Sequence, residues 1–139
     1  MGSAVVKVTT GGLEKLSDRI KKLAISKRKN ADTASRMLAE DLRREVQNQI
    51  NAQGLVDTGV YRDTIGIAGP FKQDSGDSSY FVVTEAPQSL RLEFGFVGTD
   101  ALGRDYNDPE HPHWRPASVL IQGKAAGVYR DAIIGGVSE

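Results

Sequence analysis

A helical apolar stripe in the first half of the chain constrains the fold most strongly. Its members recur every four residues, as expected for an α-helix that buries one face. Asp32 or Thr33 can cap the start of this helix, and Gly54 is placed to end it after about Ala52. At the usual rise it is about 30 Å long, so we expect it to cross a small sheet. The stripe consists of Ala34, Leu38, Leu42, Val46 and Ile50.

The chain before this stripe predicts a strand and a shorter, separate helix. Residues 5–10 are β-branched apart from Lys7, and Gly11-Gly12 can end such a strand. Apolar residues with helical spacing follow, and after them comes a basic cluster, Lys27 to Lys29. This cluster could contact phosphate together with Lys21 and Lys22, although a solvated helix end is the simpler interpretation. The apolar residues of the short helix are Leu13, Leu16, Ile20 and Leu23.

The segment Val56–Ile65 marks the change from helical to strand-like patterning. Asp57 or Thr58 can cap a short helix there, and with Asp57 as the cap Val56 and Tyr61 have the spacing of a hydrophobic staple. Four residues, Asp57, Thr58, Gly59 and Arg62, are therefore predicted to set the fold at this turn.

Two contacts are expected inside this turn. Gly59 keeps the turn slim, so that another backbone can approach closely. Arg62 can pair with Asp57 or with Asp63, and the sequence leaves both open.

The second half of the chain predicts strands, two long loops and a final helix. Strands are expected from Thr64 to Ala68, where Gly69-Pro70 interrupts the pattern, and from Tyr80 to Thr84. The alternation of Leu90, Leu92, Phe94 and Phe96 with other residues is the clearest strand pattern. Polar, turn-rich composition predicts loops at about residues 69–79 and 98–113. The final helix, about Pro116 to Ile134, is expected to present Leu120, Ile121, Val128, Ala132 and Ile133, with Gly123 and Gly127 either allowing close helix packing or simply weakening the helix.

Together these elements predict one α+β domain over residues 1–139, with a small, mainly antiparallel sheet packed against the long helix and the C-terminal helix. The 18 basic and 18 acidic side chains cancel, which removes a global attraction to nucleic acid or anionic membrane. The chain has no cysteine, which excludes disulfides and thiolate metal sites. No apolar run is long enough to cross a bilayer, and the N-terminus lacks the pattern of a signal peptide, so we expect a cytoplasmic protein.

One segment offers candidate metal ligands. Asp108, Glu110, His111 and His113 lie close together in the sequence and are possible ligands for a divalent cation. The alternative function is a metal-dependent hydrolase that uses Glu110, His111 and His113. Two prolines stiffen this segment and no second cluster supplies the remaining ligands, so we assign no catalytic, metal or cofactor residue. A nucleic-acid-binding module that uses the basic cluster is a third alternative.

The order of the short motifs resembles a phage tail-component family, whose members act as tail-completion or head–tail joining (neck) proteins of long-tailed phages. The resemblance covers nearly the whole chain, but the loop at Asp74–Ser79 and the insertion between Gly98 and Trp114 depart from the family pattern. The matching residues are an opening strand that runs into Gly12-Leu13-Glu14-Lys15-Leu16, the long helix, Val56-Asp57-Thr58-Gly59 with Arg62-Asp63-Thr64-Ile65, Leu92-Glu93-Phe94-Gly95, and Arg115-Pro116-Ala117.

The resemblance implies a structural virion protein without catalytic residues or cofactor. Its expected partners are further copies of itself in a ring, about six as in a homohexamer, a tail tube or tail terminator protein, and head connector proteins. It implies no membrane contact, and contact with nucleic acid only as the genome passes through the ring. The expected location is the tail or neck of the virion, after assembly in the host cytoplasm. The two long loops and Lys27–Lys29 are the expected contact surfaces.

Overall fold

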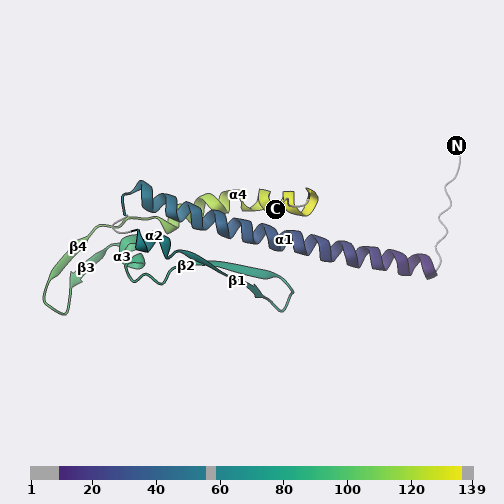
Figure 1. Cartoon of the computed structure of the whole chain (residues 1–139), viewed down its shortest axis with the longest axis horizontal. Coiled ribbons are helices and arrows are strands. Elements are labelled where there is room, and N and C mark those ends of the chain that lie inside the picture. The colour runs from purple at the N-terminus through teal and green to yellow at the C-terminus, as the bar shows by residue number, and fades with distance from the viewer. Residues whose placement is uncertain (1–9, 56–58, 136–139) are drawn as a thin grey trace.

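The structure is a computed structural model that describes residues 10–55 and 59–135. Helix α1 lies between α4 on one side and the β1–β2 hairpin on the other, while the β3–β4 hairpin projects at the end opposite the start of α1 (Figure 1). The elements are α1 (Thr10–Ala52), α2 (Val60–Asp63), β1 (Gly66–Lys72), β2 (Ser78–Val83), α3 (Gln88–Phe94), β3 (Phe96–Thr99), β4 (Asp105–Asp108) and α4 (Trp114–Gly135).

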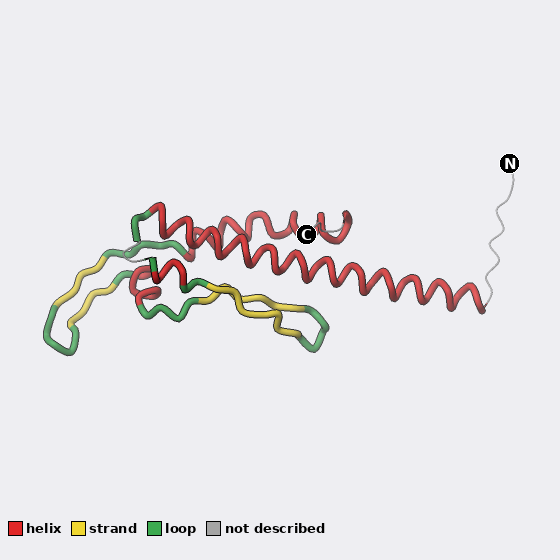
Figure 2. Tube along the Cα trace, in the orientation of Figure 1, coloured by secondary structure: helices red, strands yellow, loops and turns green. Residues whose placement is uncertain are grey.

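The predicted α+β class is confirmed. The described strands form two separate antiparallel pairs, β1 with β2 and β3 with β4. Figure 2 shows these two yellow hairpins extending in opposite directions from the helical centre. Helix α1 packs against α4 and against β2, as expected for a long helix that carries the sheet.

Helix α1 is one continuous helix of 43 residues, so the prediction of two helices separated near Asp32 is wrong. The hydroxyl of Thr33 donates to the carbonyl of Lys29, and that of Ser35 donates to the carbonyl of Ala31. Both side chains therefore bond back into the helix, four residues earlier, and do not cap a new one. No glycine or proline lies between Leu13 and Asp32 to break the helix.

The prediction that a strand at the start of the chain ends at Gly11-Gly12 is also wrong. Thr10 and Gly11-Gly12 belong to α1, so the glycines do not end a strand. Residues 5–9 of the expected strand lie outside the described residues.

Helix α1 ends at Ala52, shortly before Gly54, as predicted. Gly54 has φ 66°, its N–H donates to the carbonyl of Asn51, and the N–H of Leu55 donates to the carbonyl of Ile50. These two bonds form a Schellman motif, which satisfies carbonyls at the helix end. Leu55 then packs against the core.

The predicted inner stripe of α1 is confirmed. Val46 and Ile50 are fully buried, and Leu42 packs against them. The same cluster includes Tyr61 and Ile65 from the region of α2, together with Ala117 from α4. It also contacts Leu92 of α3, so it joins α1, α2, α3 and α4.

Strand β1 runs through Gly69-Pro70, where the sequence analysis expected an interruption. The peptide bond there is cis, and the pairing register shifts between Ala68 and Phe71. A bulge accommodates the proline, because the extra residue removes the need for its missing N–H in the ladder. The expected loop at residues 69–79 is consequently reduced to a turn between Lys72 and Ser78.

The strand predicted over Leu90–Phe96 is wrong: Gln88–Phe94 form helix α3, and only Phe96–Thr99 form a strand. Leu90 and Phe94 are exposed, whereas Ser89 and Glu93 are buried. The alternation of apolar residues therefore does not follow burial. The prediction of one long loop at residues 98–113 is also wrong, because Asp105–Asp108 form strand β4, which pairs with β3.

Helix α4 begins at Trp114 and ends at Gly135, close to the predicted bounds. Ala117 and Ala132 are buried as its inward face, but Leu120 and Ile133 are exposed, contrary to expectation. A side chain at Gly123 would meet no atom within 4 Å, so no helix packs closely there.

No helix among residues 10–55 and 59–135 combines the length and apolar character needed to cross a bilayer.

The helix end at Gly54 generates a prediction with a matched control. Gly54→Ala should lower the free energy of unfolding by about 1 kcal/mol, because a residue with a Cβ is strained at positive φ. Gly123→Ala should raise it by about 0.5–1 kcal/mol, because Gly123 lies within a helix and its Cβ position is open. Urea denaturation measures both, and equal effects of the two substitutions would contradict the assignment.

Candidate functional site

The predicted turn is only partly within the described residues. Val56, Asp57 and Thr58 lie outside them, but α2 begins at Val60 with Gly59 at its N-cap position, so the prediction of Asp57 or Thr58 as the N-cap residue is wrong. Gly59 is described: it has φ 81° and stands directly before α2, where a side chain would lie 3.2 Å from Nη2 of Arg62. The close neighbour is thus a guanidinium group, not the backbone that we expected.

Arg62 links α2 to the end of α1. Its Nε donates to Oδ1 of Asp63 at 3.0 Å, and its Nη1 donates to Oδ1 of Asn51 at 3.1 Å. The carbonyl of Arg62 accepts from Nε2 of Gln47. Of its two candidate partners, Asp63 is therefore paired, and Asp57 lies outside the described residues. Arg62 acts as a structural tie between two helices.

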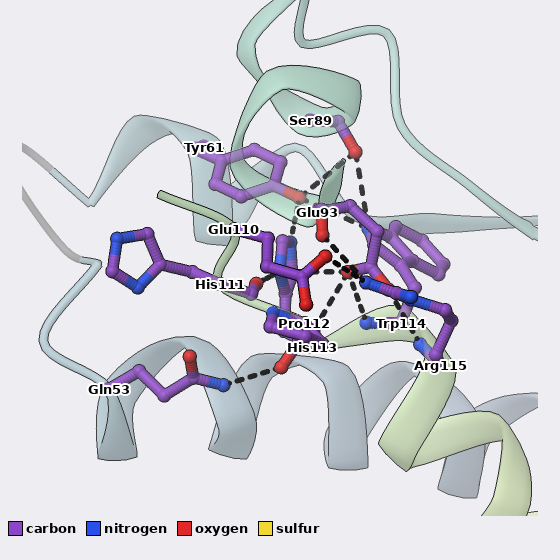
Figure 3. A network of polar contacts seen from close by, with 10 residues as sticks. All are labelled: Gln53, Tyr61, Ser89, Glu93, Glu110, His111, Pro112, His113, Trp114 and Arg115. Carbon is purple, nitrogen blue, oxygen red and sulfur yellow. Dashed lines mark hydrogen bonds and ion pairs between the residues drawn. The ribbon is translucent and has the colours of Figure 1, made fainter. Parts of the chain in front are cut away.

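The densest polar network lies at the N-terminus of α4 and centres on Glu93 (Figure 3). Glu93 Oε2 accepts from the backbone N–H groups of His113 at 2.8 Å and Trp114 at 2.9 Å, and Oε1 accepts from that of Arg115 at 3.0 Å. These N–H groups belong to the first turn of α4 and have no partner within the helix. A carboxylate from α3 therefore caps α4, where the helix dipole favours negative charge.

Arg115 closes the network from the solvent side. Its Nε donates to Oε1 of Glu93 at 3.0 Å, and its Nη2 donates to the carbonyl of Glu93 and to Oε2 of Glu110. The guanidinium also stands 4.9 Å from the centre of the Phe94 ring. The Arg115 side chain of α4 is thus bonded to both the side chain and the backbone of Glu93 in α3.

The contacts also set the charge of both groups. Burial would raise the pKa of the Glu93 carboxyl, but the three N–H groups and the Arg115 guanidinium outweigh burial, and its pKa lies below the ordinary value. The hydrogen bond to Glu93 raises the pKa of the Arg115 guanidinium. Glu93 is therefore an anion held in place, unsuited to donate or accept a proton near neutral pH.

His113 is fully buried beside Glu93. Its Nδ1 lies 2.7 Å from the carbonyl oxygen of His111 and 3.1 Å from Oε2 of Glu93, and both are acceptors, so this nitrogen carries a proton. Its Nε2 lies 2.6 Å from the Tyr61 hydroxyl, and that hydroxyl donates to Oγ of Ser89 at 3.0 Å. The Trp114 indole N–H donates to the oxygens of Tyr61 and Ser89, each at 3.1 Å.

These contacts do not support the metal-site hypothesis. Both ring nitrogens of His113 are engaged within the protein, and Glu110 pairs with Arg115. Figure 3 shows the His111 ring directed away from the network. Asp108 pairs with Arg91. Among the described residues, no group of three or more histidine, aspartate or glutamate side chains is arranged to bind a metal ion.

The basic cluster is partly engaged. Arg28 lies over the turn between β1 and β2, where a Cβ at Gly76 would stand 2.7 Å from its Nη1. At the turn end of the same hairpin, Lys72, the last residue of β1, pairs with Asp32 of α1 at 3.2 Å. Arg28 of the cluster is therefore next to the hairpin turn, and the Lys72–Asp32 ion pair joins the hairpin to α1.

An apolar groove opens beside the network. It has a volume of about 500 Å³ and runs between the loop after β2, α3 and the start of α4. Its lining includes Leu90 and Phe94 of α3, Trp114 and Arg115 of α4, and Glu85. The groove is open to solvent and mainly lined by carbon, which suits an apolar side chain better than a charged ligand.

The network itself was not predicted from the sequence. In the strand expected over Leu90–Phe96, Glu93 is one of the residues that alternate with the apolar side chains, and nothing in the sequence pattern indicates roles for Ser89 or the Tyr61 hydroxyl. The available signal was a carboxylate between Leu92 and Phe94, followed by Gly95. Gly95 has φ 72°, and a side chain there would stand 2.7 Å from the carbonyl oxygen of Asp108. The chain after β4 passes so close to this position that a side chain would collide with its backbone, which requires glycine.

The network predicts a large difference between two glutamates. Glu93→Gln places an amide N–H₂ against N–H donors and should lower the free energy of unfolding by about 2–4 kcal/mol. Glu110→Gln, at an exposed residue with one 3.3 Å contact to Arg115, should change it by less than about 1 kcal/mol. Chemical denaturation of the three proteins tests this, and a mild effect of Glu93→Gln would refute the capping role.

The same substitution should alter the pH dependence of stability. Unfolding returns the Glu93 carboxyl to its ordinary pKa of 4.5, above its pKa in the folded protein. Its contribution is therefore complete above that pH and is lost as the pH falls through the folded pKa. The stability difference between wild type and Glu93→Gln should shrink from about pH 6 to about pH 3. A constant difference would contradict the assignment.

Comparison with known families identifies the chain. Residues 14–95 match the HK97-gp10-like family, described as "Bacteriophage HK97-gp10, putative tail-component". The match spans the described part of α1 from Glu14 onward, both strands of the first hairpin, and α3 with Glu93 and Gly95. Neither the curated proteins nor the solved structures contain a match. The chain belongs to the HK97-gp10-like family of bacteriophage tail components.

Proposed function

We propose that this tail component acts at the head-proximal end of a long phage tail, where it completes the tail or joins it to the head. The observation that carries the proposal is the family match over residues 14–95, which supports a structural role in a phage tail. The order of the short motifs, which continues beyond the family match to Arg115-Pro116-Ala117, is the additional support for the neck position.

The architecture supports a role in assembly. A small core joins the four helices, while the N-terminal half of α1 and two hairpins extend from it (Figure 1). Extended elements of this kind bury little surface within one subunit and leave it for neighbours. Copies of the chain would form a closed ring, in which one surface of each copy contacts a different surface of the next.

The proposed partners follow from that position. They are further copies of the chain in a ring of about six, a tail tube or tail terminator protein on one side, and head connector proteins on the other. DNA would meet the ring only during passage. The proposed location is the virion neck, with assembly in the host cytoplasm.

We further propose that the chain performs no catalysis in this role. The hydrogen bonds of His113 and the pairing of Glu110 with Arg115 support this over a hydrolase, because a catalytic metal needs free ligands and an open coordination position.

Electron microscopy of the protein mixed with purified tails that lack it tests the position. We expect additional density at the head-proximal end of the tails, and increased joining to filled heads. Tails incubated with the Glu93→Gln variant at a temperature where it is unfolded provide the control. Density at the distal tip, or along the tube, would refute the neck position while leaving the family assignment intact.

A further inference from the structure

The N-terminal half of α1 presents an apolar stripe that nothing in the described chain covers. Helix α1 continues past the ends of α4 and of the β1–β2 hairpin (Figures 1 and 2). We call this part, residues 12–26, the arm, and every one of its side chains is exposed. The stripe residues are each between 52% and 58% exposed and comprise Leu13, Leu16, Ile20 and Leu23.

The stripe has the form of a helix that docks into a groove. Its spacing of three, four and three residues places all members on one face. Arg19 flanks this face, being three residues after Leu16 and four before Leu23, and Lys27 continues it four residues after Leu23. Asp18 lies on the opposite face. The docking face is therefore apolar with basic edges.

Charge is divided unevenly along the molecule. Residues 12–29 carry seven basic and two acidic side chains, a net charge of +5, although the whole chain is neutral. Residues 85–115, which form α3, the β3–β4 hairpin and the start of α4, carry six acidic and three basic side chains, a net charge of −3. These two regions lie toward opposite ends of the molecule (Figure 1).

This division argues against pairing of two arms. Two parallel arms would bring like charges together, and the stripe covers only about two heptads, fewer than a stable coiled coil needs. Opposite charges favour contact between the arm of one copy and the far end of another. Repeated contacts of this type join copies head to tail, which closes into a ring when the rotation allows.

The groove beside the Glu93 network is the matching surface at that end. Leu90 and Phe94, which line it, are 72% and 59% exposed, and Glu85 stands among the lining residues. Its volume of about 500 Å³ is large enough for apolar side chains projecting from one face of a helix. Because two of its lining residues, Glu93 and Arg115, are bonded to each other, part of the groove is held in place before anything binds.

We propose that the arm of one copy docks into the groove between α3 and α4 of a second copy, with Leu16 and Ile20 as apolar anchors and Arg19 facing Glu85. The proposal rests on the self-assembly part of the proposed function and names its surface. A single contact of this size is weak, and a closed ring strengthens it because each copy both gives and receives an arm.

Cysteine cross-linking between copies tests the contact, because the chain has no native cysteine. Ser17→Cys lies beside the stripe, and Leu90→Cys lies in the groove. A mixture of the two variants with a short bismaleimide should give several-fold more cross-linked dimer than either variant alone. Gln122→Cys, at an exposed position on α4, replaces Leu90→Cys in the control mixture and should give only background.

Charge reversal provides a second measurement. Arg19→Glu in the Ser17→Cys protein should reduce the yield several-fold, and Arg130→Glu, at an exposed residue of α4, should leave it unchanged. The yield should also fall as salt increases. Dimers between two Ser17→Cys copies as the main product, a yield at the level of the Gln122 control, or an arm that binds duplex DNA while the Ser17–Leu90 yield stays at background would each overturn the proposal.

The outcomes separate this contact from the tail position. Tails that gain density at their head-proximal end, with background cross-linking, would remove the arm–groove contact and leave the proposed function. Specific cross-linking with no density on tails would support the arm–groove contact and remove the proposed position on the tail.

Discussion

The fold depends on one carboxylate placed at the start of one helix. Glu93 belongs to α3, yet its two oxygens accept hydrogen bonds from three consecutive N–H groups at the start of α4. Desolvating a carboxylate is costly, and here the helix terminus and Arg115 replace the lost water. Without this contact, α4 would lose the cap of its first turn, and α3 would be joined to α4 only by weaker contacts such as that of the Trp114 indole with Ser89.

The network also explains why two short motifs far apart in the sequence occur in one chain. Leu92-Glu93-Phe94-Gly95 supplies the carboxylate, and its glycine allows the segment after β4 to pass closely. Arg115-Pro116-Ala117 supplies the guanidinium, and its alanine is fully buried in the core against α1. Each motif is therefore half of one contact. The family match ends at Gly95, so it contains the acidic half and stops before the basic one.

Local patterns predicted the elements whose burial follows sequence periodicity. The stripe from Ala34 to Ile50, the helix end at Gly54 and the start of α4 near Trp114 were found because each depends on neighbouring residues. The continuity of α1 was missed because Thr33 can cap a helix or bond back into one, and residue type does not decide between them.

Helix α3 and its carboxylate were missed for another reason. Its buried face consists of Ser89 and Glu93, whose partners lie about twenty residues or more away in the chain. Apolar alternation gave the wrong period because Leu90 and Phe94 face outward, toward the groove. Contacts between segments far apart in the sequence produce no periodicity in it. The sequence pattern therefore predicts neither the Glu93 network nor the position of the basic and acidic regions at opposite ends of the molecule.

The length of α1 has a mechanical consequence. Its C-terminal half packs against α4 and the β1–β2 hairpin, while the N-terminal part extends beyond them. This extended part is stiff, because no glycine or proline interrupts it after Leu13. At a rise of about 1.5 Å per residue the free part is roughly 22 Å long, so a tilt of about 10° at its root displaces the tip by roughly 4 Å. A small change in the packing of α1 against α4 would thus move the N-terminal end of α1 by several ångströms.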